Sequence, residues 1–338
     1  MRARNAVSGT IQSMIGNDND DLGLECCLSL IFKLLDGLIR KPSRPAQQGA
    51  QSLQTVPGHG LAATRTFVWQ SLDLSAGIDY PTGSAGRRDN VFAMLASPPR
   101  FVLDIGCASG DVARGLMEAY PEAKVWGIES NPNSAARAKQ HLERVITENF
   151  DTVDWAAQRA TVADFDTVLL LDVLEHMPDP WSTLANLRKQ VNAQAQLVLS
   201  LPNVRNMMLI RDLMSGYWRY RDMGLLDVTH LRFFTGYEAV RMIYQTGFRV
   251  ERSSFSMSIE TSTEYMRMKD GPFPQRIEFE KGSLLIESLE ELQSFAALQH
   301  LFLIRPAHYD DLDASEKVLA QGAHPPTHAM GADYAGIL

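Results

Sequence analysis

Short apolar runs alternate with amphipathic stretches along most of the chain, and the first clear pair lies between residues 101 and 120. The run FVL at residues 101–103 is typical of a buried parallel strand. The stretch DVARGLMEAY at residues 111–120 repeats apolar residues with helical spacing, and its first residue, Asp111, is of a type that caps helices. Gly106 and Gly110 bracket a tight loop between the two. The pattern predicts a strand, a glycine-rich turn and a helix, which is the opening unit of a nucleotide-binding α/β sheet.

The same alternation continues towards the C-terminus. Six further runs predict strands, at residues 124–128, 144–147, 167–171, 195–199, 248–254 and 298–304. Helical stretches separate most of them, among them residues 134–142, 261–268 and 287–295. We therefore expect an α/β fold, with a parallel sheet covered by helices on both faces.

The two ends of the chain differ from this pattern. Residues 22–40 predict one amphipathic helix, because charged residues interrupt the apolar run and argue against a signal peptide or a stable membrane insertion. This helix is expected to pack on the catalytic domain or on a second copy of the chain in a homodimer. Residues 41–60, rich in Pro, Gln and Gly, complete an N-terminal extension of residues 1–60 as a linker. Residues 306–338 are expected to form a mobile C-terminal tail.

Net charge and cysteine content narrow the range of partners, metal sites and cellular locations that the chain is expected to have. The formal net charge of -8 argues against a nucleic-acid partner, which would require a basic surface. The three cysteines, Cys26, Cys27 and Cys107, have no metal-binding spacing, so no metal is expected. Their small number fits a reduced, cytoplasmic location.

The glycine-rich loop distinguishes between nucleotides. A dinucleotide site needs G-x-G-x-x-G, but Ala108 stands where the second glycine would be, which disfavours a nicotinamide dehydrogenase. Asp104 precedes the loop directly; its carboxylate would repel a pyrophosphate and attract a sulfonium or an ammonium group. Glu129 ends the second predicted strand, where a carboxylate can accept hydrogen bonds from ribose hydroxyls. These features indicate a site for a cationic nucleoside such as S-adenosylmethionine.

At these residues, and again at DVLEHMPDPW (residues 172–181), the chain resembles the class I S-adenosylmethionine-dependent methyltransferases. The stretch G-x-W-x-Y followed by GLLDVTHLRFFT resembles their ubiquinone-type O-methylating group and its glycan-cluster relatives. The resemblance implies a Rossmann-like, seven-stranded, mostly parallel sheet with the last strand antiparallel, in a domain over residues 61–305 with its core at 85–305. It implies S-adenosylmethionine as cofactor, held by Asp104, Gly106, Cys107, Ala108, Gly110, Glu129, Ser130, Asn149, Phe150 and Asp172. Asn149 stands where such enzymes usually have an acid beside the adenine.

Residues 201–235 correspond to the family's substrate-side insertion, which would bind the methyl acceptor. Aromatic side chains stack on rings and arginines bind carboxylate or phosphate, so the expected acceptor-binding residues are Arg205, Tyr217, Trp218, Tyr220 and Phe233. The alternative is that about half of these residues pack on the sheet or face solvent.

Two histidines are candidate bases for deprotonating a hydroxyl acceptor. His176 follows the fourth predicted strand, and His230 follows Asp227 by three residues, so that the carboxylate could orient and charge the imidazole. A structural role for either histidine stays open. We expect a methyltransferase acting on an oxygen of a sugar, a glycolipid precursor or a phenol- or quinone-like compound. The alternative is a non-catalytic S-adenosylmethionine-binding partner that regulates a biosynthetic enzyme.

Overall fold

The computed structural model describes residues 88–321. The expected amphipathic helix and linker of residues 1–60 lie outside the described residues. Within residues 88–321, no helix combines the length and the apolar character that crossing a membrane requires.

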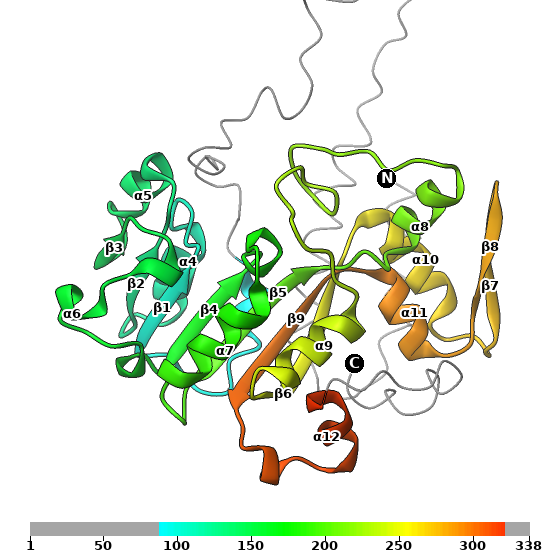
Figure 1. Cartoon of the computed structure of the whole chain (residues 1–338). Helices are drawn as coiled ribbons and strands as arrows, with labels where there is room; N and C mark the ends of the chain where they lie inside the picture. The colour runs from blue at the N-terminus through cyan, green and yellow to red at the C-terminus, as the bar shows by residue number, and fades with distance from the viewer. Residues whose placement is uncertain (1–87, 322–338) are drawn as a thin grey trace, which may run out of the picture. The chain divides into compact units, whose positions relative to one another are not determined.

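Seven strands form the main sheet in the order β3-β2-β1-β4-β5-β9-β6 (Figure 1). Their bounds are β1 Phe101–Ile105, β2 Lys124–Ile128, β3 Arg144–Ile146, β4 Thr167–Leu171, β5 Gln196–Pro202, β6 Phe248–Met257 and β9 Ala297–Pro306. Neighbouring strands from β3 to β5 pair in parallel, whereas β9 runs antiparallel between β5 and β6. The predicted Rossmann-like sheet and its antiparallel last strand are confirmed.

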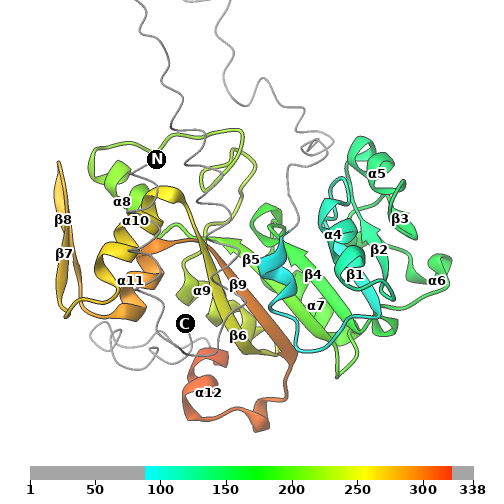
Figure 2. The same cartoon turned by 180° about the vertical axis from the view of Figure 1, so that it is seen from behind.

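Helices cover both faces of this sheet, as expected. On one face lie α7 (Pro180–Gln190) and α9 (Gly236–Gln245), seen in front in Figure 1. On the other lie α3 (Asp89–Phe92), α4 (Asp111–Ala119) and α5 (Pro132–Ala138), seen in front in Figure 2. Each face has its own apolar core, because strand side chains alternate: Leu103 and Ile105 join the core under α7, and Val102 joins the core under α4. Asp104 therefore shares its face with Val102.

Short elements connect these parts. They are α6 (Trp155–Gln158) and the 3-10 turns η2 (Phe150–Thr152), η3 (Val162–Asp164), η4 (Leu174–His176) and η5 (Tyr309–Asp311). Thr235 caps the start of α9, where its hydroxyl accepts a hydrogen bond from the Glu238 N–H at 3.3 Å.

A second group of elements forms a small body with its own apolar core, here called the α8–α11 lobe. It comprises α8 (Met207–Met214), α10 (Ile259–Met268), the hairpin β7 (Gln275–Phe279) and β8 (Gly282–Ile286), and α11 (Leu289–Ala296). Met207, Met268, Ile286 and Leu292 are fully buried in its interior. The helices near residues 261–268 and 287–295 were predicted, whereas the hairpin was not.

The chain after β9 is ordered further than the sequence indicates. We expect a mobile tail from residue 306, but α12 (Ala314–Ala320) packs against α9. Glu316 accepts a hydrogen bond from the Tyr244 hydroxyl at 2.9 Å, and Leu319 is buried. A reciprocal capping box between Asp313 and Glu316 starts the helix. The expectation is wrong for residues 306–321, and residues 322–338 lie outside the described part.

Candidate functional site

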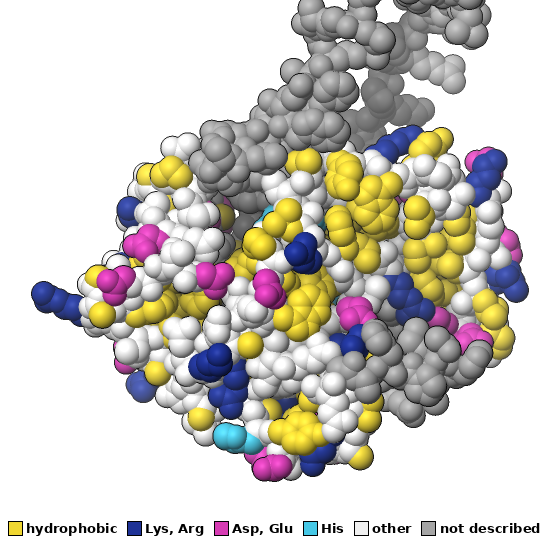
Figure 3. Space-filling model, in the orientation of Figure 1, with side chains coloured by type: hydrophobic (Ala, Val, Ile, Leu, Met, Phe, Trp, Pro, Cys, Tyr) yellow, Lys and Arg dark blue, Asp and Glu magenta, His cyan; other side chains and the backbone are white. Residues whose placement is uncertain are grey.

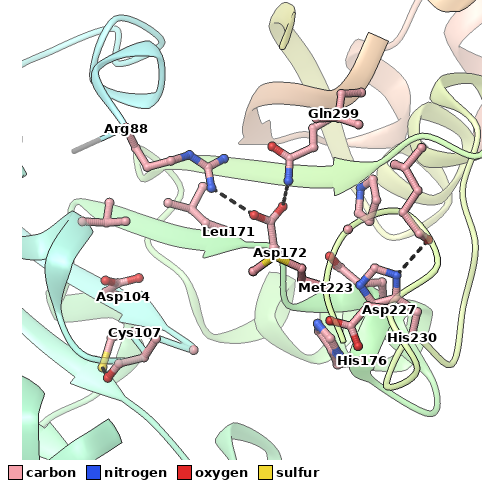
Figure 4. Close-up of a pocket in the computed structure, with 18 residues that line it drawn as sticks. Arg88, Asp104, Cys107, Leu171, Asp172, His176, Met223, Asp227, His230 and Gln299 are labelled. Atoms are coloured by element: carbon pink, nitrogen blue, oxygen red, sulfur yellow. Dashed lines mark hydrogen bonds and ion pairs between the residues drawn. The ribbon is translucent and has the colours of Figure 1, made fainter. Parts of the chain in front are cut away.

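A cavity of about 470 Å³ opens at the carboxyl ends of β1, β4 and β5 (Figure 4). In open α/β sheets, ligands bind at this edge, where the strand order reverses; here that point lies between β1 and β4. Eight of the predicted site residues line the cavity: Asp104, Gly106, Cys107, Ala108, Asp172, His176, Asp227 and His230. The structure thus brings together the loop after β1, the loop after β4 and the segment before α9.

The glycine-rich loop turns sharply beneath the cavity. The N–H groups of Gly106 and Cys107 both donate to the carbonyl of Ile128, at 2.8 and 3.1 Å. Gly106 has φ 73°, and a Cβ atom there would come within 2.6 Å of Val173 in the loop after β4. A larger residue would therefore push the β1 and β4 loops apart. Gly110, which precedes α4, does not line the cavity.

Asp104 presents a buried carboxyl group to the cavity. Its side chain is 3% exposed, and its Oδ2 atom has no hydrogen-bond partner among residues 88–321. The pKa of Asp104 is raised from 3.8 to about 7, mainly by burial; the nearby Glu129 adds to the rise, and Arg88 opposes it. An unpartnered buried carboxyl at a cavity wall fits a ligand that brings a positive charge.

Asp172 lies at the other side of the cavity within a network of polar side chains (Figure 4). Its Oδ1 atom accepts hydrogen bonds from Ser200 Oγ at 2.7 Å and Gln299 Nε2 at 2.9 Å, and its Oδ2 atom pairs with Arg88 Nη1 at 2.9 Å. Sequence reasoning missed Arg88 and Gln299, because each is far from Asp172 along the chain.

Glu129 follows β2 directly, as predicted, and its carboxylate lies beside the glycine-rich loop. It does not line the cavity; its two oxygens accept the N–H groups of Ala108 at 2.9 Å and Asn131 at 2.7 Å. The carboxylate thus fixes the glycine-rich loop. Ser130, Asn149 and Phe150 also lie outside the cavity lining. Asn149 caps η2, and Phe150 is buried in the core under α7.

Asp227, Thr229 and His176 form a chain of hydrogen bonds at the far end of the cavity. The Thr229 hydroxyl donates to Asp227 Oδ1 at 2.7 Å and lies 3.0 Å from His176 Nδ1. The Thr229 hydroxyl already donates its hydrogen to Asp227, so towards His176 its oxygen can only accept. The proton of the neutral imidazole therefore lies on Nδ1, and the lone pair lies on Nε2. We expected Asp227 to orient His230; the structure shows it acting on His176 through Thr229, a residue that sequence reasoning missed.

His230 is held separately, with its Nδ1 3.2 Å from the carbonyl of Leu225 and its ring 4.8 Å from that of His176. Burial lowers the pKa of both imidazoles, so each is neutral near pH 7. Glu175 lies beside them, fully buried, and burial raises the pKa of its carboxyl group.

The predicted acceptor-binding residues divide into two groups. Arg205 points into the α8–α11 lobe, where it pairs with Glu291 at 2.7 Å and stacks on the Phe295 ring at 4.1 Å. The remaining four are more than a third exposed: Tyr217, Trp218, Tyr220 and Phe233. They belong to the loop between α8 and α9, on a face where hydrophobic side chains gather (Figure 3).

A second cavity of about 390 Å³ adjoins the first and shares Met223, Gly224, Leu225 and Leu298 with it. Tyr217 and three arginines, Arg211, Arg219 and Arg221, line it. Two acids, Asp212 and Glu260, also line this cavity, so it carries charges of both signs. The two cavities together offer room for a cofactor end and an acceptor.

Comparison with known proteins finds methyltransferases that are similar to part of this chain. Residues 87–253 match the family model described as "Methyltransferase domain". The chain is 32% identical over 130 residues to a ubiquinone biosynthesis O-methyltransferase of Aromatoleum aromaticum, covering 37% of this chain and 48% of the relative. It is 27% identical over 110 residues to a malonyl-[acyl-carrier protein] O-methyltransferase of Anoxybacillus flavithermus, covering 31% and 40%. The chain thus spans about half the length of the curated relatives it matches or less.

Among solved structures, a SAM-dependent methyltransferase of Thermotoga maritima superposes with a TM-score of 0.43 at 14% identity, over 65% of this chain and 87% of that one.

Proposed function

We propose that this chain, whose residues 87–253 form a class I S-adenosylmethionine-dependent methyltransferase domain, transfers a methyl group to an oxygen atom of a small acceptor. One observation carries the proposal: the buried carboxyl group of Asp104, whose Oδ2 atom has no hydrogen-bond partner among residues 88–321, faces a cavity at the switch point of the sheet. The donor set fits S-adenosylmethionine, whose methionine end carries both charges. Asp104 and Asp172 would hold its ammonium group, and Arg88 its carboxylate.

Bound S-adenosylmethionine supplies a methyl group activated by the sulfonium charge. The residues of this chain contribute position and proton removal. His176 Nε2 is the proposed proton acceptor, because the Asp227–Thr229 pair fixes the tautomer that leaves its lone pair free. His230 is the second candidate and faces the same cavity.

For the acceptor we propose a sugar, a glycolipid precursor or a phenol- or quinone-like compound. The exposed aromatic side chains Tyr217, Trp218, Tyr220 and Phe233 support a flat or cyclic ligand. Arginines in the adjoining cavity support an acidic group on it. Two relatives are named for ubiquinone biosynthesis and for malonyl-[acyl-carrier protein], so phenolic and carboxylate oxygens both belong in the test.

The proposal also keeps a reduced, cytoplasmic setting and no nucleic-acid partner. The buried free thiol of Cys107 and the net charge of -8 support these two points.

In the experiment, the protein is incubated with methyl-labelled S-adenosylmethionine and a panel of phenols, hexose derivatives and dicarboxylates. Labelled products are identified by mass spectrometry. We expect label on an oxygen of one class, and no turnover by Asp104→Asn. Asp310→Asn, an exposed acid far along the chain, serves as the matched control and should keep parental turnover. Binding of S-adenosylhomocysteine without labelling of any acceptor, in lysate fractions as well as the panel, would support the non-catalytic alternative instead.

A further inference from the structure

Three side chains with metal-binding atoms meet at the wall of the main cavity. One ligand atom each from Glu175, His176 and His230 lies within 4.8 Å of the others. Glu175 and His176 belong to η4, after β4, and His230 lies in the loop before α9. The spacing of the cysteines gives no reason to expect a metal. The three ligands proposed here are not cysteines, and they come from two loops that are distant in sequence.

Both imidazoles have the orientation that metal ligands usually have. In His176, Nδ1 is held by Thr229, and in His230 Nδ1 lies within hydrogen-bonding distance of the Leu225 carbonyl. Histidine ligands of metals commonly donate one ring N–H to the protein in this way, which fixes the ring and frees the other nitrogen. Each ring therefore keeps a lone pair on Nε2.

Glu175 offers a buried carboxyl group that a bound cation would hold in its ionised form. Its side chain is 0% exposed, and neither carboxylate oxygen has a hydrogen-bond partner among residues 88–321. A buried carboxylate without a partner is costly unless it is paired or coordinates a metal. The carboxylates of Asp172 and Asp227 lie near enough to act on Glu175, and the nearby guanidinium of Arg88 is paired with Asp172. The region therefore has an excess of negative charge.

We propose that Glu175, His176 and His230 bind a divalent transition-metal ion of the zinc type. Two imidazoles and one carboxylate suit zinc better than magnesium, and three protein ligands leave a position open for another molecule. Zinc ligands lie about 2.0–2.2 Å from the metal, so the three atoms must approach one another by small side-chain rotations. The open position would face the cavity that these residues line.

The use of the ion rests on the proposed methyl transfer. With the acceptor oxygen at the open position, the metal would lower the pKa of its hydroxyl, and the proton would leave to solvent water. The new O–C bond would form as the S–C bond breaks, and the sulfonium would become a neutral thioether. With the ion bound, both histidines would be ligands, and solvent water would take the role of proton acceptor that the metal-free mechanism gives to His176.

In the test, the full chain without a histidine tag is first freed of metal by chelation and dialysis. It is then titrated with zinc and, in a separate sample, with cobalt as a spectroscopic probe. We expect one zinc ion per chain by calorimetry, and a visible cobalt spectrum of a site with fewer than six ligands. Glu175→Gln keeps the shape of the side chain and removes the charge, so it should weaken zinc binding at least tenfold without unfolding the protein. His230→Asn should do the same, and His308→Asn, an exposed histidine, should bind zinc as the parent does. Equal zinc affinity in the parent and Glu175→Gln would overturn the site.

Methyl transfer with and without chelator separates this proposal from the proposed function. Zinc bound by the parent and lost in Glu175→Gln, without labelling of any acceptor, would keep the metal site and remove the methyltransferase activity. If the chain binds no zinc and methyl transfer continues in the presence of chelator, the methyltransferase activity stands and the metal site is ruled out.

Discussion

The Arg88 guanidinium lies 2.9 Å from the Asp172 carboxylate across the main cavity. Arg88 is also close enough to Asp104 to lower its pKa, so its positive charge acts on both acids of the cofactor end. The pair gives that end of the cavity the mixed charge that an amino acid zwitterion requires. The proposed placement of the methionine group follows from it.

Arg88→Gln should weaken binding of S-adenosylhomocysteine by about 10- to 100-fold, the value of a hydrogen bond to a charged group. It should leave binding of 5′-methylthioadenosine, which lacks the amino acid, within about twofold of the parent. Calorimetry with both ligands on both proteins measures this. An equal loss for the two ligands would show that Arg88 supports the fold of the site rather than the carboxylate.

Cofactor affinity should depend on pH through Asp104. Because its pKa is about 7 in the free protein, the group is mostly protonated at pH 6 and mostly ionised at pH 8. A cationic ligand binds the ionised form, so S-adenosylmethionine affinity should rise roughly tenfold between these values. Asp104→Asn should bind weakly at both pH values, with the Asp104-dependent rise removed. A parental slope that persists in this variant would assign the titration to another group.

The same shift has a consequence for stability. Below pH 3.8 Asp104 is protonated in both folded and unfolded chains; as pH rises to about 7, the unfolded chain ionises first and the folded state loses stability. A rise of this size in the pKa lowers the free energy of unfolding by at most about 4 kcal/mol at pH 8. Asp104→Asn should therefore raise the melting temperature of the ligand-free protein at pH 8 and change it little at pH 4. Thermal unfolding at the two pH values tests this, and a lower melting temperature at pH 8 would contradict it.

Thr229→Val should lower kcat by about 10- to 100-fold, part of what general base catalysis contributes. The substitution keeps the side-chain shape and removes the hydroxyl between Asp227 and His176. Thr229→Ser retains the hydroxyl and should restore most of the rate. Neither change should alter S-adenosylhomocysteine affinity by more than about twofold, since Thr229 does not line the main cavity. Equal kcat in the Val and Ser variants would exclude the hydrogen-bond chain from catalysis.

Arg205→Ala should reduce stability by about 1 kcal/mol, the value of a partly exposed ion pair, and leave the acceptor KM unchanged. Its guanidinium is engaged with Glu291 and the Phe295 ring. Arg219→Ala, at the second cavity, should instead raise the acceptor KM with little effect on unfolding. Urea unfolding and steady-state kinetics of the two variants separate the roles, and a raised KM in Arg205→Ala would restore the sequence-based interpretation.

The sheet was predictable because its strands are short apolar runs bounded by glycine, proline and charged residues. The β7–β8 hairpin was not, since QRIEF and GSLLI mix exposed and buried positions without a clear period. Its burial comes from α10 and α11, which no local pattern reveals. The same holds for α12, whose few apolar residues are held by contacts with α9.

The site divides along the same line. The meeting of Asp104, Asp172 and His176 was predictable, because the ends of parallel strands meet at one edge of the sheet. Arg88, Gln299 and Thr229 were not, since their roles depend on contacts between distant segments. Glu129 was predicted at the end of β2, whereas the hydrogen bonds that its oxygens accept from two backbone N–H groups were not, and its contact with ribose stays a prediction.

The α8–α11 lobe has its own apolar interior, separate from the two cores of the sheet. Substitutions that reshape it need not disturb the donor end. A chimaera that takes residues 207–214 and 258–296 from a homologue, and keeps α9, β6 and β9 of the host, should fold and keep the cofactor preference of the host. The lobe can then change by recombination while the donor-binding end of the cavity stays the same, so that related proteins with one cofactor can differ in their acceptors.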